Sequence, residues 1–254
     1  MSFFDKIKSG LNSIVSSAER SLESSPCEIC EKQLSFYEKK HLADGFICGA
    51  CFEKASPYFI QKHKKQKATV EQFKAHLHDR QKNAAAFREF SPTLILGDYT
   101  QILIDEDHHK FIVYCAQEHK RKSYAEANID ILDCSSVLSC NVDIEENKTE
   151  VETNASGSGI AFYEYTYDFY VIIGVNHPYI DQIRIKLNPE EIENMGTLYR
   201  KYEQLAKDIC STLMERKNAS RESNANQLAF TVCPWCGTKL SHAIGTCEHC
   251  GGTL

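Results

Sequence analysis

Apolar and polar residues alternate with a period of two through much of the chain between residues 91 and 187, which predicts β-strands. The clearest run is FYEYTYDFYVIIGVN, residues 162–176, where every second residue is apolar and Glu164, Thr166 and Asp168 fall on the other face. TLILGDYTQILIDEDHHKFIVYC predicts three more strands, and SVLSCNVDIEEN and YIDQIRIKLN each predict another. We therefore expect an antiparallel set of six or seven strands.

Helical spacing replaces this alternation on both sides of the predicted strands. Residues 57–90 contain a capping box at Thr69 and Gln72. One helix face there is lined by Val70, Phe73, Leu77, Ala84 and Phe87. After the strands, Asn188, Pro189 and Glu191 predict a helix start, and Gly196 is expected to break that helix. A longer helix follows, with a buried stripe of Leu198, Tyr202, Leu205, Ala206, Ile209 and Leu213.

Residues 1–24 predict an amphipathic helix with one apolar face opposite a serine-rich face. Bulky apolar residues beside a weakly charged polar face are typical of helices that lie in the lipid interface. The segment also resembles the N-terminal membrane-binding helix of phage-shock-type membrane-stress proteins. Alternatively, the same face packs on this protein or on a second copy. The positions expected to bind membrane or partner are Phe3, Phe4, Ile7, Leu11, Ile14, Val15 and Leu22.

Eight of the twelve cysteines form two sets of paired C-x2-C motifs. The first set is Cys27, Cys30, Cys48 and Cys51, and the second is Cys233, Cys236, Cys247 and Cys250. Two such turns facing each other give the tetrahedral sulfur cage that Zn²⁺ prefers. Glycine follows the second cysteine at Gly237 and Gly251, where it tolerates a tight turn, whereas Glu31 and Phe52 take these places in the first set. We predict two structural Zn²⁺ ions with no open ligand position.

Three other uses of these cysteines compete with zinc. A redox C-x-x-C normally opens a helix in a βαβ unit, which the sequence does not show. A disulfide framework would require a secreted protein. An iron or iron–sulfur centre with four cysteines is the chemical alternative to zinc. His41, His242 and His249 are predicted to be surface residues. The remaining cysteines are expected to be core or near-core residues: Cys115, Cys134, Cys140 and Cys210.

Composition and charge narrow the range of cellular locations expected for this protein. The net charge is −6, yet residues 57–90 carry eight Lys and Arg against three Asp and Glu, and residues 91–217 carry 22 acidic against 12 basic residues. No apolar run is long enough for a membrane span, and polar residues interrupt the N-terminal apolar segment, so no secretory signal is expected. We expect a cytoplasmic protein, with a membrane surface as a second location.

Six strands followed by one amphipathic helix are typical of a pleckstrin-homology-like barrel. The chain resembles an uncharacterised bacterial family with an N-terminal four-cysteine zinc ribbon followed by a PH-like domain, over residues 25 to 215. The resemblance rests on CEIC, LADGFICGAC, TVEQFKAHLHDRQKNAAAF and ILIDEDHHKFIV. The C-terminal CPWCGTKL and CEHCGG are similar to accessory zinc ribbons of other bacterial proteins. The family implies a fold and metal sites, but no activity.

The expected architecture is α+β. In order, it comprises an amphipathic helix (1–24), a four-cysteine zinc-ribbon module (25–56), a basic helical linker (57–90), a PH-like antiparallel β-barrel capped by a C-terminal helix (91–217), a flexible linker (218–228) and a second four-cysteine zinc ribbon (229–254).

The expected function is that of a non-enzymatic zinc-binding adaptor that engages protein partners or self-associates. It would reach membranes through its first helix. No G-x-S-x-G, P-loop or dinucleotide motif is present, and no small-molecule substrate is expected. The alternative is a nucleic-acid-binding protein that uses its zinc ribbons and its basic helix.

Overall fold

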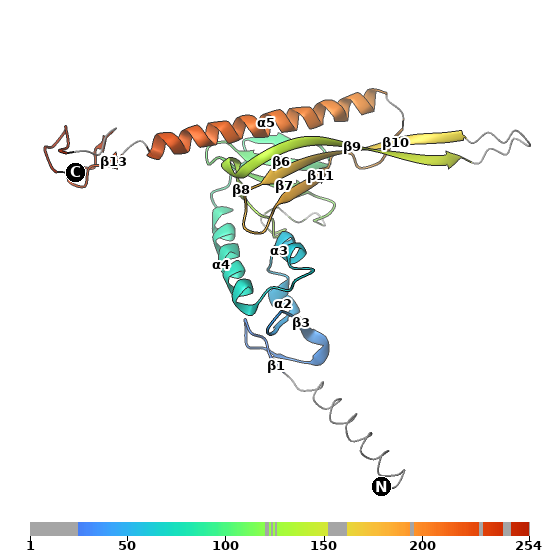
Figure 1. The fold of residues 1–254 in the computed structure, drawn as a ribbon, viewed down its shortest axis with the longest axis horizontal. Helices are drawn as coiled ribbons and strands as arrows, with labels where there is room; N and C mark the ends of the chain where they lie inside the picture. The colour runs from blue at the N-terminus through green and yellow to red at the C-terminus, as the bar shows by residue number, and fades with distance from the viewer. Residues whose placement is uncertain are drawn as a thin grey trace, which may run out of the picture. The chain divides into compact units, whose positions relative to one another are not determined.

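The computed structural model describes residues 25–119, 122, 124, 126–151, 162–193, 196–228, 231–240 and 245–253. The apolar face predicted at residues 3–22 lies outside these residues. The chain divides into two compact units (Figure 1). The first contains the chain up to Glu89 together with Tyr124–Asp130, and the second contains Phe90–Ser123 and Ile131–Leu254.

The first unit begins with two short hairpins. Strands β1 (Ser25–Pro26) and β2 (Gln33–Leu34) pair around the first C-x2-C turn, and the 3-10 helix η1 (Phe36–Glu38) follows. Strands β3 (Lys39–His41) and β4 (Phe46–Cys48) form the second hairpin, which leads directly into helix α2 (Gly49–Phe52). Leu34 and Ile47 are fully buried, so each hairpin contributes one aliphatic side chain to the core.

Helices α3 (Pro57–Lys62) and α4 (Val70–Ala86) complete the first unit. The predicted capping box of α4 is present, because Thr69 Oγ1 accepts a hydrogen bond from Gln72 N and Gln72 Oε1 accepts one from Thr69 N. The buried face of α4 differs from the predicted stripe: it consists of Phe73, His76 and Arg80, while Leu77 is only half-buried. Polar residues can occupy this face because they form hydrogen bonds with buried partners, as described below.

The second unit contains two four-stranded sheets. The first has the antiparallel order β5 (Leu94–Leu96), β6 (Thr100–Asp105), β7 (Lys110–Cys115) and β8 (Leu132–Asp133). This confirms the three strands predicted between residues 93 and 115. In the second sheet, β9 (Val137–Val151) and β10 (Phe162–Val175) form a long hairpin. The other edge of β10 pairs with β11 (Gln182–Lys186) and β12 (Ile192–Glu193), both antiparallel.

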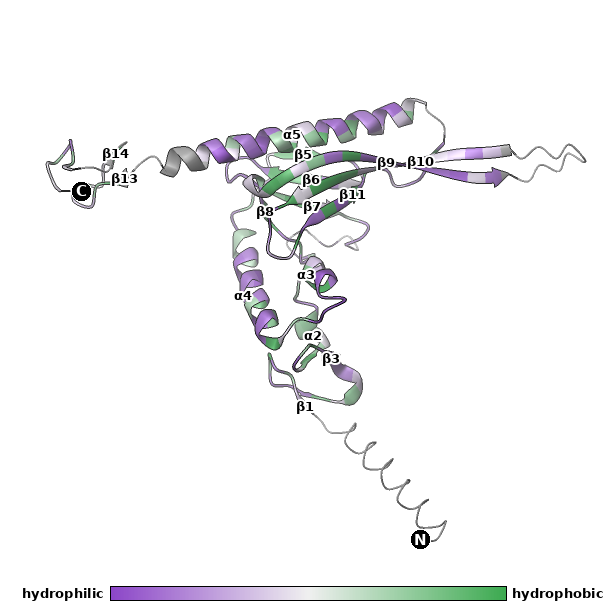
Figure 2. Cartoon of the chain, viewed as in Figure 1, coloured by the Kyte–Doolittle hydropathy of each residue, from purple (hydrophilic) through white to green (hydrophobic). Residues whose placement is uncertain are grey.

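Helix α5 (Thr197–Leu228) packs along β9, β10 and the 3-10 helix η2 (Cys134–Ser136) (Figure 1). Figure 2 shows apolar and polar residues alternating along α5, as an amphipathic helix requires. Four residues of the predicted stripe are buried: Tyr202, Ala206, Ile209 and Leu213. They meet the alternating face of β10, which buries Phe169, Val171 and Ile173. Leu205 is only half-buried, and Leu198, predicted to be buried, is 58% exposed at the start of the helix. None of the described helices is long and apolar enough to cross a membrane.

Three predictions need correction. Among the described strands, no pairing joins the two sheets, so they are open sheets and do not close into a barrel. No helix starts at Asn188, because its side chain accepts from Phe169 N and donates to Glu190 O, which stabilises the turn that leads into β12. Residues 218–228 are not a flexible linker but the end of α5.

Candidate metal centres

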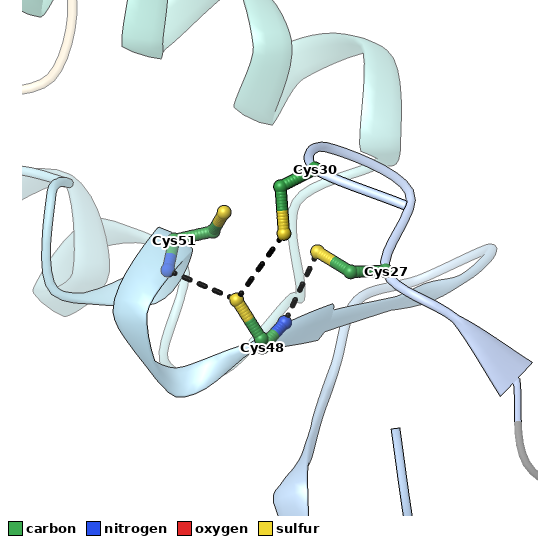
Figure 3. Close-up of side chains that lie close together, drawn as sticks. All are labelled: Cys27, Cys30, Cys48 and Cys51. Carbon is green, nitrogen blue, oxygen red and sulfur yellow. Dashed lines mark hydrogen bonds between the residues drawn. The ribbon is translucent and has the colours of Figure 1, made fainter. Parts of the chain in front are cut away.

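The first four cysteines converge from three elements of the first unit (Figure 3). Cys27 and Cys30 lie in the turn between β1 and β2, Cys48 ends β4, and Cys51 lies in α2. Cys27, Cys48 and Cys51 are buried, whereas Cys30 is exposed. The sequence therefore predicted the correct set of four residues, and the two hairpins bring them together.

The spacing of the sulfur atoms fits one tetrahedral ion. All four ligand atoms lie within 4.8 Å of one another, and the Sγ atoms of Cys30 and Cys48 are 3.7 Å apart. A tetrahedron with metal–sulfur bonds of about 2.3 Å has sulfur–sulfur edges of about 3.8 Å. Backbone N–H groups support the sulfurs, because Cys48 N donates to Cys27 Sγ and Cys51 N donates to Cys48 Sγ, both at 3.3 Å (Figure 3).

The same cage recurs near the C-terminus. Cys233 and Cys236 lie between β13 (Thr231–Val232) and β14 (Lys239–Leu240), and Cys247 and Cys250 lie between the bridged residues Thr246 and Thr253. Two sulfur pairs are 3.6 and 3.7 Å apart: Cys233 with Cys250, and Cys236 with Cys247. In the part of the chain that the structure describes, the two four-cysteine sets are the groups of three or more His, Cys, Asp and Glu that could hold a metal ion.

Three of the four C-x2-C turns have the same backbone. In each, the residue after the second cysteine donates its N–H to the carbonyl of the first: Glu31 to Cys27, Gly237 to Cys233 and Gly251 to Cys247, at 2.8–2.9 Å. This residue adopts the left-handed conformation, with φ of 61° at Glu31 and 72° at Gly237 and Gly251. Only the fourth turn differs, because Cys51 continues into helix α2. Glu31 therefore stands where the turn favours glycine.

We expect Glu31→Gly to stabilise the first metal site, because glycine adopts positive φ without the steric cost that glutamate carries. The expected gain is about 1 kcal/mol, measured as tighter metal retention in competition with a chelator. Gly237→Ala is the matched opposite change in the second site. It should weaken retention there, although open space surrounds its Cβ position. Unchanged retention in both variants would show that backbone conformation does not limit metal binding.

In each cage, the local electrostatic environment favours the thiolate form of one cysteine. Burial opposes ionisation of Cys27, but backbone amides of Cys30, Cys48 and Ile29 lower its pKa to about 6. In the second cage, hydrogen bonds from the side chain and backbone of Thr238 lower the pKa of Cys236 to about 6. Gly252 N favours the thiolate of Cys250, yet the neighbouring sulfurs, led by Cys236, raise the pKa of Cys250 to about 12. Full deprotonation of four crowded thiols therefore calls for a cation at their centre.

The tryptophan in the CPWC turn is held in a defined orientation on the protein surface. Trp235 is 73% exposed, yet its Nε1 donates to the carbonyl of Thr253 at 3.0 Å. Its ring also covers Gly252, where a Cβ atom would lie 2.7 Å from Cγ of Trp235. The two C-x2-C turns of the second cage therefore hold each other in place. The first turn carries Trp235, and the second is followed by Gly252 and the Thr253 carbonyl, which contact the Trp235 side chain.

A buried polar cluster lies beside the first cage and was not apparent from the sequence. Asp130 accepts hydrogen bonds from Ser56 Oγ at 2.6 Å and from Arg80 Nη1 at 2.5 Å. His76 Nε2 accepts from Ser56 N, and its ring stacks on Phe59 with centroids 3.9 Å apart. These residues belong to α4, the start of α3 and the segment 126–130. Such residues are distant in sequence, so only folding brings them together.

A cleft of about 540 Å³ opens next to the same cluster. Aliphatic and aromatic groups line part of it, including Ile29 of the first C-x2-C turn together with Leu77 and Phe87 of the predicted α4 stripe. Polar side chains such as Arg80 and Glu126 line the rest. Leu77, Ala84 and Phe87 of the predicted stripe therefore line this cavity instead of the core.

The structure places the other predicted residues as follows. His41 and His249 are exposed, as predicted, and neither belongs to a cage. His242 and the apolar face at residues 3–22 lie outside the described residues. Cys115 and Cys134 are buried, as predicted. Cys140 and Cys210 are only half-buried and face each other, which no spacing in the sequence indicated.

Comparison with known families gives one match, which covers the first cage and names no activity. The family described as "Domain of unknown function (DUF4428)" matches residues 26–76, which include all four cysteines of the first cage and the beginning of α4. No curated protein matches the chain, and no solved structure matches it either. The matched region thus contains the first four-cysteine set and its two short hairpins, followed by α2, α3 and the first residues of α4.

Proposed function

We propose that this protein is a non-enzymatic zinc-binding adaptor that engages protein partners. Zn²⁺ is the ion we assign to both cages, because four thiolates in a tetrahedron suit a structural zinc site and leave no position for substrate. Iron is the alternative for the same donors. Metal analysis of the purified full-length chain should give about two zinc ions per chain, and a visible thiolate–iron absorption would contradict the assignment.

The exposed tryptophan is the observation that carries the adaptor proposal. An aromatic side chain that is 73% exposed, but fixed by Thr253 and Gly252, loses little conformational freedom when a partner covers it. Tryptophan is among the residues most enriched at the energetic centres of protein interfaces. Val232, in the strand β13 that precedes the CPWC turn, is a second exposed apolar side chain of this module, at 56% exposure.

The first cage presents a comparable surface. Tyr37 and Phe36 of η1 are 92% and 49% exposed and form an edge-to-face pair with centroids 5.6 Å apart. Both metal modules thus display aromatic rings on a rigid support, which favours recognition of proteins over small molecules. The second unit extends the proposal: two open antiparallel sheets and one long helix support a PH-like domain, although a fold alone does not name a ligand.

The test compares partner capture by the full-length protein with capture by Trp235→Ser and Tyr37→Ser. Each variant should retain two zinc ions, because neither residue is a ligand, and each should reduce recovery of a specific protein by at least about 10-fold. Lys32→Ala, which removes an exposed ion pair with Glu38, serves as the control and should leave capture unchanged. Equal capture by all variants would exclude the aromatic surfaces as the binding sites.

Nucleic-acid binding is the second candidate, supported by the lysines of residues 62–67, which are exposed. Binding of a labelled oligonucleotide that weakens steeply with salt, and is lost when Lys64, Lys65 and Lys67 become alanine, would favour it. Membrane attachment through residues 1–24 belongs to the adaptor proposal. Flotation with liposomes should then require those residues, and a chain lacking residues 1–24 should stay in the soluble fraction.

A further inference from the structure

Two cysteines outside the metal cages meet between the long helix and the long hairpin of the second unit. Cys140 lies in β9 and Cys210 lies in α5, and their Sγ atoms are 3.1 Å apart. This distance is shorter than the 3.6–3.7 Å that separates sulfur pairs within the cages. A disulfide bond measures about 2.05 Å, so an approach of about 1 Å would join the two residues.

The surroundings distinguish this pair from the other thiols of the second unit. Cys115 and Cys134 are buried to 1% exposure or less, and burial raises the pKa of Cys134 to about 12. Cys140 and Cys210 are half-buried, so small molecules can reach them. The pair does not belong to either described group of metal-ligating residues. It therefore has the accessibility and the partner that an oxidation site requires, and lacks the ligand set of a metal site.

The contact between the two thiols also shifts their pKa values in opposite directions. The S–H group of Cys140 donates a hydrogen bond to the sulfur of Cys210. This bond lowers the pKa of Cys210 and raises that of Cys140. A thiol with a favoured thiolate, adjacent to a second thiol that can resolve the first product, is the arrangement found at redox-responsive cysteines.

We propose that Cys140 and Cys210 form a reversible disulfide site that responds to hydroperoxides. The Cys210 thiolate attacks one peroxide oxygen, the O–O bond breaks, and Cys210 becomes a sulfenic acid. The other oxygen takes up the proton that Cys210 released on ionising and leaves as water or an alcohol. Cys140 then attacks Sγ of Cys210 and forms the S–S bond. The sulfenic hydroxyl leaves with the Cys140 proton as water. In total, two thiols and one hydroperoxide give one disulfide, one water and one water or alcohol.

The disulfide would tie α5 to the first part of β9. A second polar contact lies further along, where Lys217 Nζ donates to the carbonyl of Leu138 at 3.0 Å. Ile209, next to Cys210, and Leu213, between Cys210 and Lys217, are completely buried. The cross-link therefore fixes a position that packing already defines, so oxidation should stabilise the native state without distorting it.

The test treats the full-length, zinc-loaded protein with one equivalent of hydrogen peroxide and maps disulfides by mass spectrometry under non-reducing conditions. The Cys140–Cys210 peptide should be the main product before metal is released from the cages. Reduction with a dithiol should restore both free thiols. Oxidation should raise the melting temperature of the second unit by roughly 5–10 °C, because the link closes a long loop.

Variants separate this proposal from general oxidation. Cys210→Ser and Cys140→Ser should each abolish the cross-link and the thermal shift, while Cys115→Ser should retain both. In the unmodified chain, an alkylating reagent should label Cys210 at least about 10-fold faster than Cys134, which tests the proposal without any substitution. Release of metal before the cross-link forms, or linkage of Cys140 to Cys134 instead, would overturn it.

Discussion

Cys247→Ser is expected to unfold the C-terminal metal module, residues 231–253, while leaving the first unit intact. Within the described part of this module, the buried residues are two of its own ligands, Cys233 and Cys247. The described residues of the module therefore supply no apolar core that could replace the metal. Structural zinc contributes about 10–16 kcal/mol in small zinc domains, so loss of one ligand removes most of the energy that holds the module together.

Trp235 makes this outcome directly measurable, because it is the sole tryptophan of the chain and lies in the module. Loss of its contacts with Gly252 and Thr253 should lower its fluorescence anisotropy, and metal content should fall from about two ions per chain to about one. A Cys115→Ala variant, which alters a buried cysteine outside both cages, should keep both metals and the anisotropy. Unchanged anisotropy in Cys247→Ser would mean that contacts other than metal ligation hold the module.

The equivalent change in the first cage should have a more limited effect. Cys48→Ser removes a ligand that also caps α2, and so should release metal and expose the backbone of residues 25–52. Helix α4 should nevertheless stay protected from hydrogen exchange. Its core contacts, Phe73 with Phe59 at a centroid distance of 5.9 Å and the stack of His76 on Phe59, do not involve the metal. Loss of protection throughout α4 would show that the metal supports the whole unit.

Asp130→Asn is expected to destabilise the first unit by about 3–5 kcal/mol. The side chains of Arg80 and Asp130 are only 9% and 4% exposed, so removing one charge leaves the other buried without its counterion. Ser56 Oγ loses a charged acceptor in the same change. Hydrogen exchange of the α4 amides should accelerate by at least about 100-fold, which corresponds to about 3 kcal/mol.

Two further variants show whether the effect comes from the buried charge. Lys82→Ala removes an exposed ion pair with Asp79 on the same helix and should change stability by less than about 0.5 kcal/mol. Replacing Arg80 with methionine and Asp130 with leucine together should restore much of the loss, since no charge is then left unpaired. A loss below about 1 kcal/mol for Asp130→Asn would show that water or neighbouring groups already compensate the guanidinium.

Hydrophobic periodicity and capping motifs predicted most of the described long helices and strands of this protein. The alternation in residues 162–176 identified strand β10 and its buried face, and Thr69 with Gln72 identified the start of α4. The same rules failed at Asn188, where a sequence typical of a helix start forms a turn stabilised by contacts with β10. They also placed a flexible linker where α5 continues to Leu228. Both errors arose where contacts or helix propagation beyond the local window decided the conformation.

The sequence by itself determined the two four-cysteine cages, because ligand type and spacing are local properties and each pair of turns can meet within a short stretch of chain. Through hydrophobic periodicity it also determined the strand pattern and most of the buried face of α5, but not the exposure of Leu198. Only the tertiary structure decided that Cys140 meets Cys210 and that Arg80 and Ser56 share Asp130. These groups are 50 to 74 residues apart in the chain, and no local periodicity encodes which distant elements pack against each other.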